Sequence, residues 1–140
     1  MKKRLVALFL VVVSAITLLA CAGGAVKAKV DYSTQTETVI TVVEADGTAT
    51  LIDAMKALKD EGKLVYESST SQYGEMINTI GSLTAEGTYY WALYTTDAEV
   101  ANTDMAVTVN GTTFYSAMVG ASSLTVKAGE SYLWRHESWA

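Results

Sequence analysis

Apolar and polar residues alternate along much of the chain after residue 36, and this period of two is typical of β-strands. TETVITVVE (36–44) is rich in β-branched residues and is followed by Asp46-Gly47, a pair typical of turns. KLVYESST (63–70) and EMINTIGSL (75–83) predict a second and a third strand. We therefore expect this part of the chain to be mostly sheet.

The segment TLIDAMKALKDEG has the period of a helix instead. A leucine, a methionine and a second leucine recur at positions i, i+4 and i+7, so they share one face. Thr50 is expected to cap the start of this helix, with Asp53 as its capping-box partner. Gly62 is expected to end it.

The strongest strand pattern is TYYWALYTTD (88–97), which holds three tyrosines and a tryptophan. Both of its faces are apolar, so we expect a central strand of the sheet. The alternation places Tyr89, Trp91 and Leu93 on one face and Tyr90, Ala92 and Tyr94 on the other.

The aromatic residues of this strand have two interpretations. A tryptophan at such a position is more often part of a core than of a binding site. If several rings were exposed together, they would form an apolar surface that can also hydrogen-bond, and such surfaces bind ligands or partners. The strand pattern alone leaves both interpretations open.

Asn110-Gly111, between β-branched runs in AVTVNGTTFY, predicts a β-hairpin with a type I′ turn. A two-residue loop would pair Val109 with Thr112. The same asparagine begins a glycosylation sequon, which we consider the weaker interpretation in a chain of bacterial appearance.

The last segment, SLTVKAGESYLWRHE (123–137), predicts a final hairpin that turns near Gly129. Its second strand would carry Tyr132, Trp134 and His136 on one face. The fold class expected from these elements is α+β. It is a small two-layer domain, with one helix packed on a mostly antiparallel sheet and an added β-hairpin.

Residues 1–20 have the form of a signal peptide. MKKR is positively charged, and the next 16 residues are uncharged and apolar. That run is shorter than the roughly 20 residues of a membrane-spanning helix. The following Leu18-Leu19-Ala20-Cys21 resembles the lipobox of bacterial lipoproteins, which implies cleavage before Cys21 and a diacylglycerol on its thiol. An ordinary cleaved signal and an uncleaved anchor are the alternatives.

The chain is thus expected to divide into three parts. Residues 1–20 are the signal peptide, 21–36 are the lipidated Cys21 and a flexible tether, and 37–140 are one folded domain. The expected location is extracytoplasmic, with the lipid on Cys21 as the membrane anchor.

The charge balance narrows the choice of partners. Loss of the first 20 residues leaves seven basic residues against 15 acidic ones, a net side-chain charge of −8. Binding to nucleic acid requires a basic surface, so we expect no nucleic-acid partner. Electrostatic adhesion to anionic lipid is excluded for the same reason.

Few residues offer catalytic chemistry. The chain has one histidine, His136, and one cysteine, Cys21, which lipidation would consume. The carboxylates lack the spacing of a zinc or calcium site, and no phosphate-binding glycine loop is present in the sequence. We expect that the protein is not an enzyme and that it binds no metal and no cofactor. We expect His136 to lie at a surface or strand edge. A hydrolase whose site the sequence does not reveal is the least favoured alternative.

Three segments in this order resemble the C-terminal β-domain of transcobalamin and intrinsic factor, a domain that many bacterial surface proteins carry without an assigned function. They are the helix TLIDAMKAL, the strand Tyr90-Trp91-Ala92-Leu93, similar to Tyr-Trp-x-Leu in the family, and the stretch VGASSLTVKAGE (119–130). The resemblance covers about residues 36–140 and implies a β-grasp-like fold.

In the eukaryotic carriers this domain closes as a lid over cobalamin held against a helical barrel. By position, the resemblance implies that Trp91, Leu93, Gly120 and Ala121 face the ligand, and Tyr89 joins them because it shares the face of Trp91. Tyr90 and Tyr94 would then pack inward against the helix. The chain departs from the family at Ala92, where the carriers have a polar residue, and in an extra segment of about residues 95–113. No stretch predicts a helical barrel.

The expectation for function is a non-catalytic binding module for a corrinoid or similar flat ligand, with a partner protein completing the site. The alternative is a structural or adhesion module that engages another surface protein. In that case the aromatic residues are core, and exposed strand edges make the contact.

Overall fold

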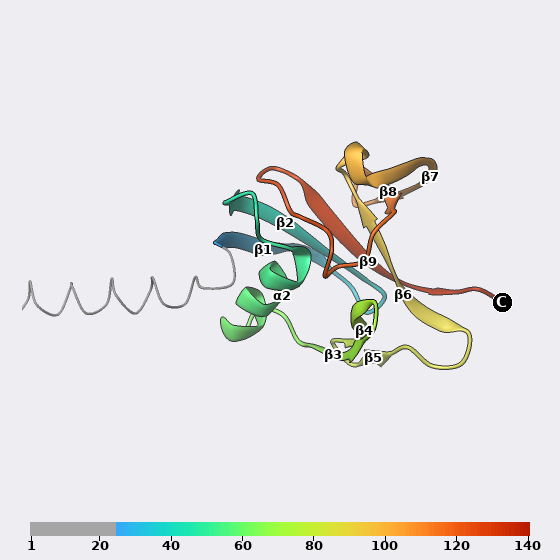
Figure 1. The fold of residues 1–140 in the computed structure, drawn as a ribbon. Coiled ribbons are helices and arrows are strands. Elements are labelled where there is room, and N and C mark those ends of the chain that lie inside the picture. Colours follow the sequence, from blue (N-terminus) through green and yellow to red (C-terminus); the bar gives the residue numbers. More distant parts are fainter. Residues whose placement is uncertain (1–24) are drawn as a thin grey trace, which may run out of the picture.

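The computed structural model describes residues 25–140, which form a small α+β domain of mostly antiparallel sheet with one α-helix, as predicted. The larger sheet is antiparallel throughout and has the order β1-β2-β9-β6-β8-β7 (Figure 1). Its strands are β1 (Val26–Ser33), β2 (Glu37–Ala45), β6 (Tyr89–Thr95), β7 (Ala101–Val109), β8 (Thr112–Ala117) and β9 (Ser131–Ser138).

A smaller antiparallel sheet and the helix cover one side of the larger sheet (Figure 1). The small sheet consists of β3 (Tyr66–Ser71), β4 (Gly74–Ile80) and β5 (Leu83–Thr84), and the helix is α2 (Leu51–Asp60). A short 3-10 helix, η1 (Ala98–Val100), precedes β7. Among residues 25–140, no helix is long and apolar enough to cross a membrane. The predicted signal peptide and Cys21 lie outside the described residues.

Helix α2 begins and ends as the sequence predicts. The Thr50 hydroxyl accepts a hydrogen bond from the Asp53 N–H at 3.3 Å, and the Asp53 carboxylate accepts one from the Thr50 N–H at 2.9 Å. This capping box satisfies two backbone donors that no helical carbonyl can reach. Gly62 follows the helix with a φ of +73°, a conformation in which glycine costs least.

The prediction of a flexible tether up to residue 36 is wrong for residues 26–33, which form β1. Val26, Ala28 and Val30 alternate with exposed polar residues and pack against the main core, so the strand buries one face as it pairs with β2. The alternation was present in the sequence, but small and charged residues obscured it.

The Asn110-Gly111 hairpin is confirmed. Val109 pairs with Thr112 and Val107 with Phe114, and both turn residues have positive φ.

The prediction of a final hairpin is wrong, because residues 123–130 do not form a strand against β9. The Leu124 carbonyl and the Val126 N–H instead bond residues 51 and 49 at the start of α2, each at 2.9 Å. Both side chains are buried there, so the backbone follows them into the core.

The apolar side chains form two clusters, one on each side of the large sheet. The main cluster contains the buried face of α2 together with Trp91, Tyr132 and Trp134. The smaller cluster contains Tyr94, with partners from β2, β7, β8 and β9. β6 is an interior strand, as expected. The prediction of which face of β6 packs against the helix is wrong. Trp91 packs on the helix side and Tyr94 on the opposite side.

Candidate functional site

A groove on the helix side of the large sheet brings together four of the five residues expected at a ligand site. Trp91 and Leu93 come from β6, and Gly120 and Ala121 come from the loop between β8 and β9. The opposite wall is β4, and the volume is about 320 Å³. We call this space the β4–β6 groove; its other lining residues are Glu75, Met76, Ile77, Asn78, Ala85, Tyr90 and Trp134.

The two walls of the β4–β6 groove are joined at one end by Ser122. The Ser122 hydroxyl accepts a hydrogen bond from the Glu75 N–H at 2.9 Å. Gly74, which precedes Glu75, has a φ of +102°, and a Cβ there would lie 2.8 Å from the Ser122 Cβ. Only glycine permits this approach, so the contact sets the distance between β4 and the Gly120-Ala121 stretch.

Trp91 lines the groove as a buried side chain and does not expose its ring. Its side chain is only 7% exposed, and its indole N–H donates to the Leu83 carbonyl at 3.2 Å. A ring held in this way cannot turn to stack on a ligand. Ala121 is likewise buried, whereas Leu93 is half-buried and Gly120 is exposed.

Trp134 adds an unusual feature to the same groove. It is 5% exposed, and its indole Nε1 is buried without a hydrogen-bond partner among residues 25–140. Buried indole N–H groups normally find an acceptor, because an unmade hydrogen bond costs free energy. Trp134, a lining residue of the groove, therefore carries one donor whose bond the described residues do not satisfy.

Tyr89 does not line the groove. It is 53% exposed, and its ring stacks on His136 with centroids 5.1 Å apart and an interplanar angle of 3°. His136 also lies 5.0 Å from the Trp91 ring, and its Nε2 is 3.1 Å from the Thr84 carbonyl oxygen. The sequence predicted a surface or strand-edge histidine. His136 is instead half-buried on β9, an interior strand, and its cross-strand pairing with Trp91 explains its aromatic contacts.

The side of the sheet opposite the groove carries a polar cluster around Glu137. Its carboxylate accepts hydrogen bonds from Tyr94 at 2.5 Å and from Tyr90 at 3.4 Å, and an ion pair joins it to Arg135 at 3.5 Å. Burial raises the pKa of Tyr94 to about 12, and the bond to Glu137 acts in the same direction. These contacts hold β6 to β9.

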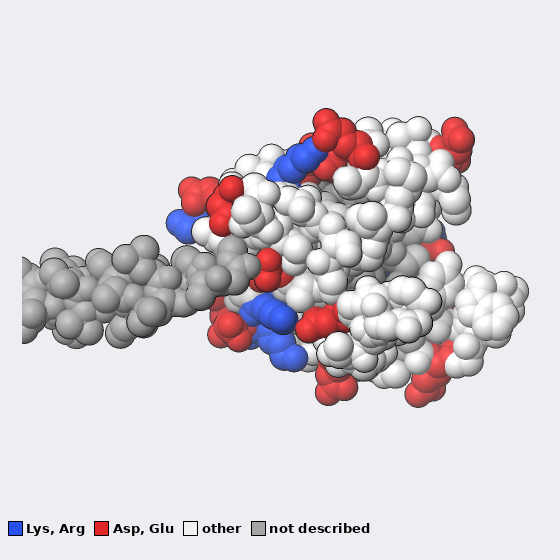
Figure 2. All heavy atoms as spheres, in the orientation of Figure 1, with Lys and Arg blue, Asp and Glu red and all other residues white. Residues whose placement is uncertain are grey.

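Charged side chains do not gather at one place on the face that Figure 2 shows. Acidic and basic groups lie beside one another around its edge, and uncharged atoms occupy the middle. In residues 25–140, no three His, Cys, Asp or Glu side chains lie together in a way that could hold a metal ion. The lining of the β4–β6 groove is mostly apolar, and Glu75 is the one charged residue in it.

The β4 wall is the part of the site that the sequence did not reveal. Met76 is 57% exposed on this wall, a large apolar side chain at the opening of the groove. Its strand was predicted, but no local pattern indicates that it faces β6. A comparison with protein-family models finds no match to the chain, and a search of curated proteins finds none.

Proposed function

We propose that the chain is a lipid-anchored extracytoplasmic lipoprotein whose domain binds a corrinoid or a similar flat ligand without catalysis. The observation that carries the proposal is the β4–β6 groove, which gathers Trp91, Leu93, Gly120 and Ala121 from two distant segments. These are the positions at which the resemblance of the sequence to the transcobalamin β-domain implies contact with the ligand.

The arrangement of elements supports the further proposal of a β-grasp-like, transcobalamin-like domain. Helix α2 follows β2 and packs on one side of an antiparallel sheet, and β6 lies inside that sheet. In this interpretation the extra segment of about residues 95–113 is β7 and the start of β8, which form the added hairpin.

In the proposed complex the groove supplies apolar contact along its length. Met76 and Leu93 would contact the flat face of the ligand, and Trp91 would support the wall behind them. Gly120 would let backbone amides approach the ligand edge, because no side chain stands there. A groove open on one side leaves room for a partner protein that completes the site.

A titration of the full chain in detergent micelles with dicyanocobinamide tests this proposal, with tryptophan fluorescence as the readout. We expect saturable quenching, because Trp91 and Trp134 both line the groove. Gly120→Phe should abolish it. A Cβ at Gly120 meets nothing within 4 Å and its φ is not positive, so the variant should fold while its ring fills the groove.

Thr113→Phe is the matched control, because Thr113 is an exposed position of β8 in the added hairpin. It should bind as the unmodified chain does. Absence of quenching at high micromolar ligand, with and without candidate partner proteins, would refute the corrinoid proposal. Equal binding by Gly120→Phe would refute the groove as the site.

A structural or adhesion module is the second candidate. Tyr73 and Trp139 are 84% and 71% exposed, and large apolar side chains exposed to this degree are typical of contact surfaces. If the module works in this way, Tyr73→Ser should reduce attachment to a partner surface protein, and Gly120→Phe should leave that attachment unchanged.

A further inference from the structure

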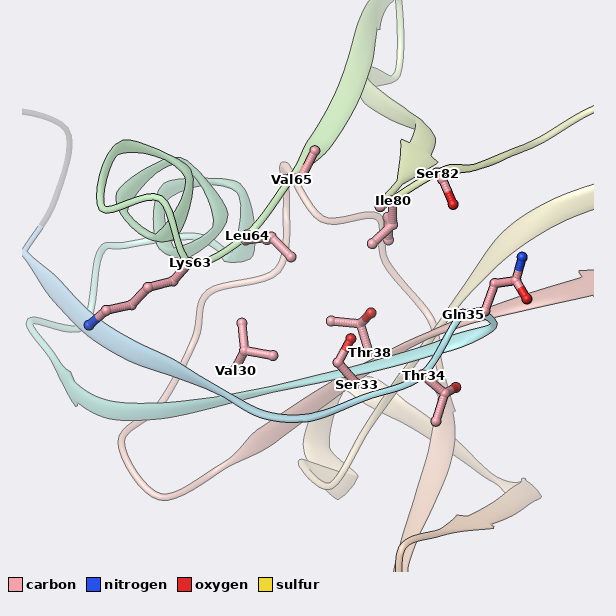
Figure 3. Close-up of a pocket in the computed structure, with 11 residues that line it drawn as sticks. Val30, Ser33, Thr34, Gln35, Thr38, Lys63, Leu64, Val65, Ile80 and Ser82 are labelled. Atoms are coloured by element: carbon pink, nitrogen blue, oxygen red, sulfur yellow. The ribbon is translucent and has the colours of Figure 1, made fainter.

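A second pocket lies between the β1–β2 turn, the segment that leads into the small sheet and the β4–β5 turn within that sheet (Figure 3). Its volume is about 300 Å³, and it shares no lining residue with the β4–β6 groove. Residues 33–38 form one wall, residues 63–65 a second and residues 80–82 a third. We call it the hairpin pocket.

The β4–β5 turn gives the hairpin pocket its third wall. Ile80 pairs with Leu83, so Gly81 and Ser82 form a two-residue turn, with Gly81 at a φ of +63°. The Gly81 N–H donates to the Val65 carbonyl at 2.8 Å, which ties this turn to the segment before β3. The walls are thus held by backbone hydrogen bonds and do not depend on flexible side chains.

Thr38 is the decisive residue of the hairpin pocket. It is only 2% exposed, yet its hydroxyl makes no hydrogen bond to any residue in the described part of the chain. Figure 3 shows this hydroxyl pointing up from β2 into the space below Leu64 and Ile80. A hydroxyl that faces the pocket and has no partner in the described part of the chain is available to hydrogen-bond a ligand there.

The remaining polar groups of the pocket are neutral. Ser33, Gln35 and Ser82 line it, and within residues 25–140 their side chains have no hydrogen-bond partner. Lys63 is the one charged lining residue, and its ammonium pairs with Glu61 at 2.9 Å. Its side chain extends away from the middle of the pocket in Figure 3. The pocket therefore offers several neutral donors and acceptors and little net charge.

The apolar part of the pocket lining is aliphatic. Val30, Leu64 and Ile80 point toward one another across it in Figure 3, and the lining contains no aromatic ring. A flat conjugated ligand would find no ring to stack on. The volume lies at the lower end of the roughly 300–1,000 Å³ of small-molecule sites, which suits one small ring with several hydroxyls.

We propose that the hairpin pocket binds one neutral saccharide unit. The C–H face of the sugar would pack on Leu64 and Ile80, and its hydroxyls would bond Thr38, Ser33 and Ser82. The site is separate from the β4–β6 groove and does not depend on the function proposed for it.

The test is an NMR titration of the ¹⁵N-labelled full chain in micelles of a zwitterionic detergent, since detergents with sugar headgroups would compete. The probes are D-glucose and N-acetyl-D-glucosamine, with acetate and N-methylacetamide as chemical controls. We expect saturable shifts with a sugar at the amides of residues 33–38 and 80–82. Thr38→Val keeps the shape but removes the hydroxyl, and it should weaken binding about five- to tenfold, the value of one hydrogen bond.

Thr70→Val on the exposed surface of β3 is the matched control and should bind normally. If Thr38→Val does not fold, Ser82→Ala at the exposed turn replaces it and should also weaken binding. Three outcomes would overturn the proposal: no saturable shift with either sugar, undiminished binding by Thr38→Val or its substitute, or tighter binding of acetate or N-methylacetamide at the same amides.

Discussion

The Glu75 N–H donates a hydrogen bond to the Ser122 hydroxyl, and this 2.9 Å contact joins two segments that are 47 residues apart in the chain. One segment begins β4 and the other follows Gly120-Ala121, so the contact lies where the two walls of the β4–β6 groove meet. The shape of the groove therefore depends on position 74, where only glycine leaves room for the Ser122 side chain.

Gly74→Ala should reduce stability more than an ordinary glycine substitution. Its methyl group would lie 2.8 Å from the Ser122 Cβ, and its φ of +102° disfavours any side chain. Gly87→Ala is the control, because Gly87 also has a positive φ but no atom within 4 Å of its Cβ. We expect a loss of about 1–2 kcal/mol in the free energy of unfolding for the control and about 1–3 kcal/mol more for Gly74→Ala, from urea denaturation. Equal losses would show that Ser122 yields without cost.

Removal of the Ser122 side chain should partly rescue Gly74→Ala. Ser122→Gly alone loses the hydrogen bond to Glu75 and should cost about 1 kcal/mol. In the double variant the clash is gone, so the combined loss should be smaller than the sum of the two single losses. A double-mutant cycle in urea measures the difference, and strict additivity would contradict the contact.

Trp91→Ala should destabilise the whole domain by about 3–5 kcal/mol, because it leaves a cavity in the core cluster. Tyr89→Ala should cost less than about 1 kcal/mol, since Tyr89 is half exposed and loses chiefly its stacking on His136. Urea unfolding followed by circular dichroism compares them. Similar small losses for both variants would support a freely exposed Trp91 that stacks on ligand.

The Asp46 carboxylate should make the free energy of unfolding depend on pH in the acid range. Its carboxylate accepts hydrogen bonds from the backbone N–H groups of Ala25, Thr48 and Ala49, which hold its pKa far below the ordinary 3.8. A lowered folded-state pKa stabilises the fold above pH 3.8, and this contribution is lost as the pH falls below that value. Asp46→Asn should reduce stability at pH 7 and flatten its decline between about pH 4 and pH 2.

Asp104→Asn, at an exposed position of β7, is the control for the acid measurement. It should unfold with the same pH profile as the unmodified chain. A decline in Asp46→Asn as steep as in the unmodified chain would show that other carboxylates cause the acid sensitivity.

Cys21→Ser should release the protein from bacterial membranes, because serine cannot carry the thioether-linked lipid that we propose for Cys21. Fractionation of cells measures this, with the unmodified chain retained in the membrane fraction. Retention of the variant would contradict lipidation and indicate an uncleaved hydrophobic anchor.

The elements that the sequence predicts well are those defined by short-range interactions. The side chains of Thr50 and Asp53 each accept a hydrogen bond from the backbone N–H of the other residue, within one turn of the helix. Asn110 and Gly111 both adopt the positive φ that a two-residue hairpin turn requires. Both features depend on neighbours within four residues, so no knowledge of the rest of the fold is needed.

Residues 123–130 show where such reasoning ends. Their alternation is compatible with a strand, but the partner of a strand is chosen by burial of distant side chains. Leu124 and Val126 are buried at the start of α2, and the backbone pairs with residues 49–51 there.

The sequence by itself determined the helix, its ends, the Asn-Gly hairpin, the interior position of β6 and the division of its side chains into two faces. Only the tertiary structure decided that Trp91 faces the helix and Tyr94 faces away. The physical reason is that both faces of β6 are apolar, so alternation separates them without ranking them. On one side α2 and β4 pack against β6, and on the other the side chains of Val109 and Phe114 pack against Tyr94, and this packing makes the choice.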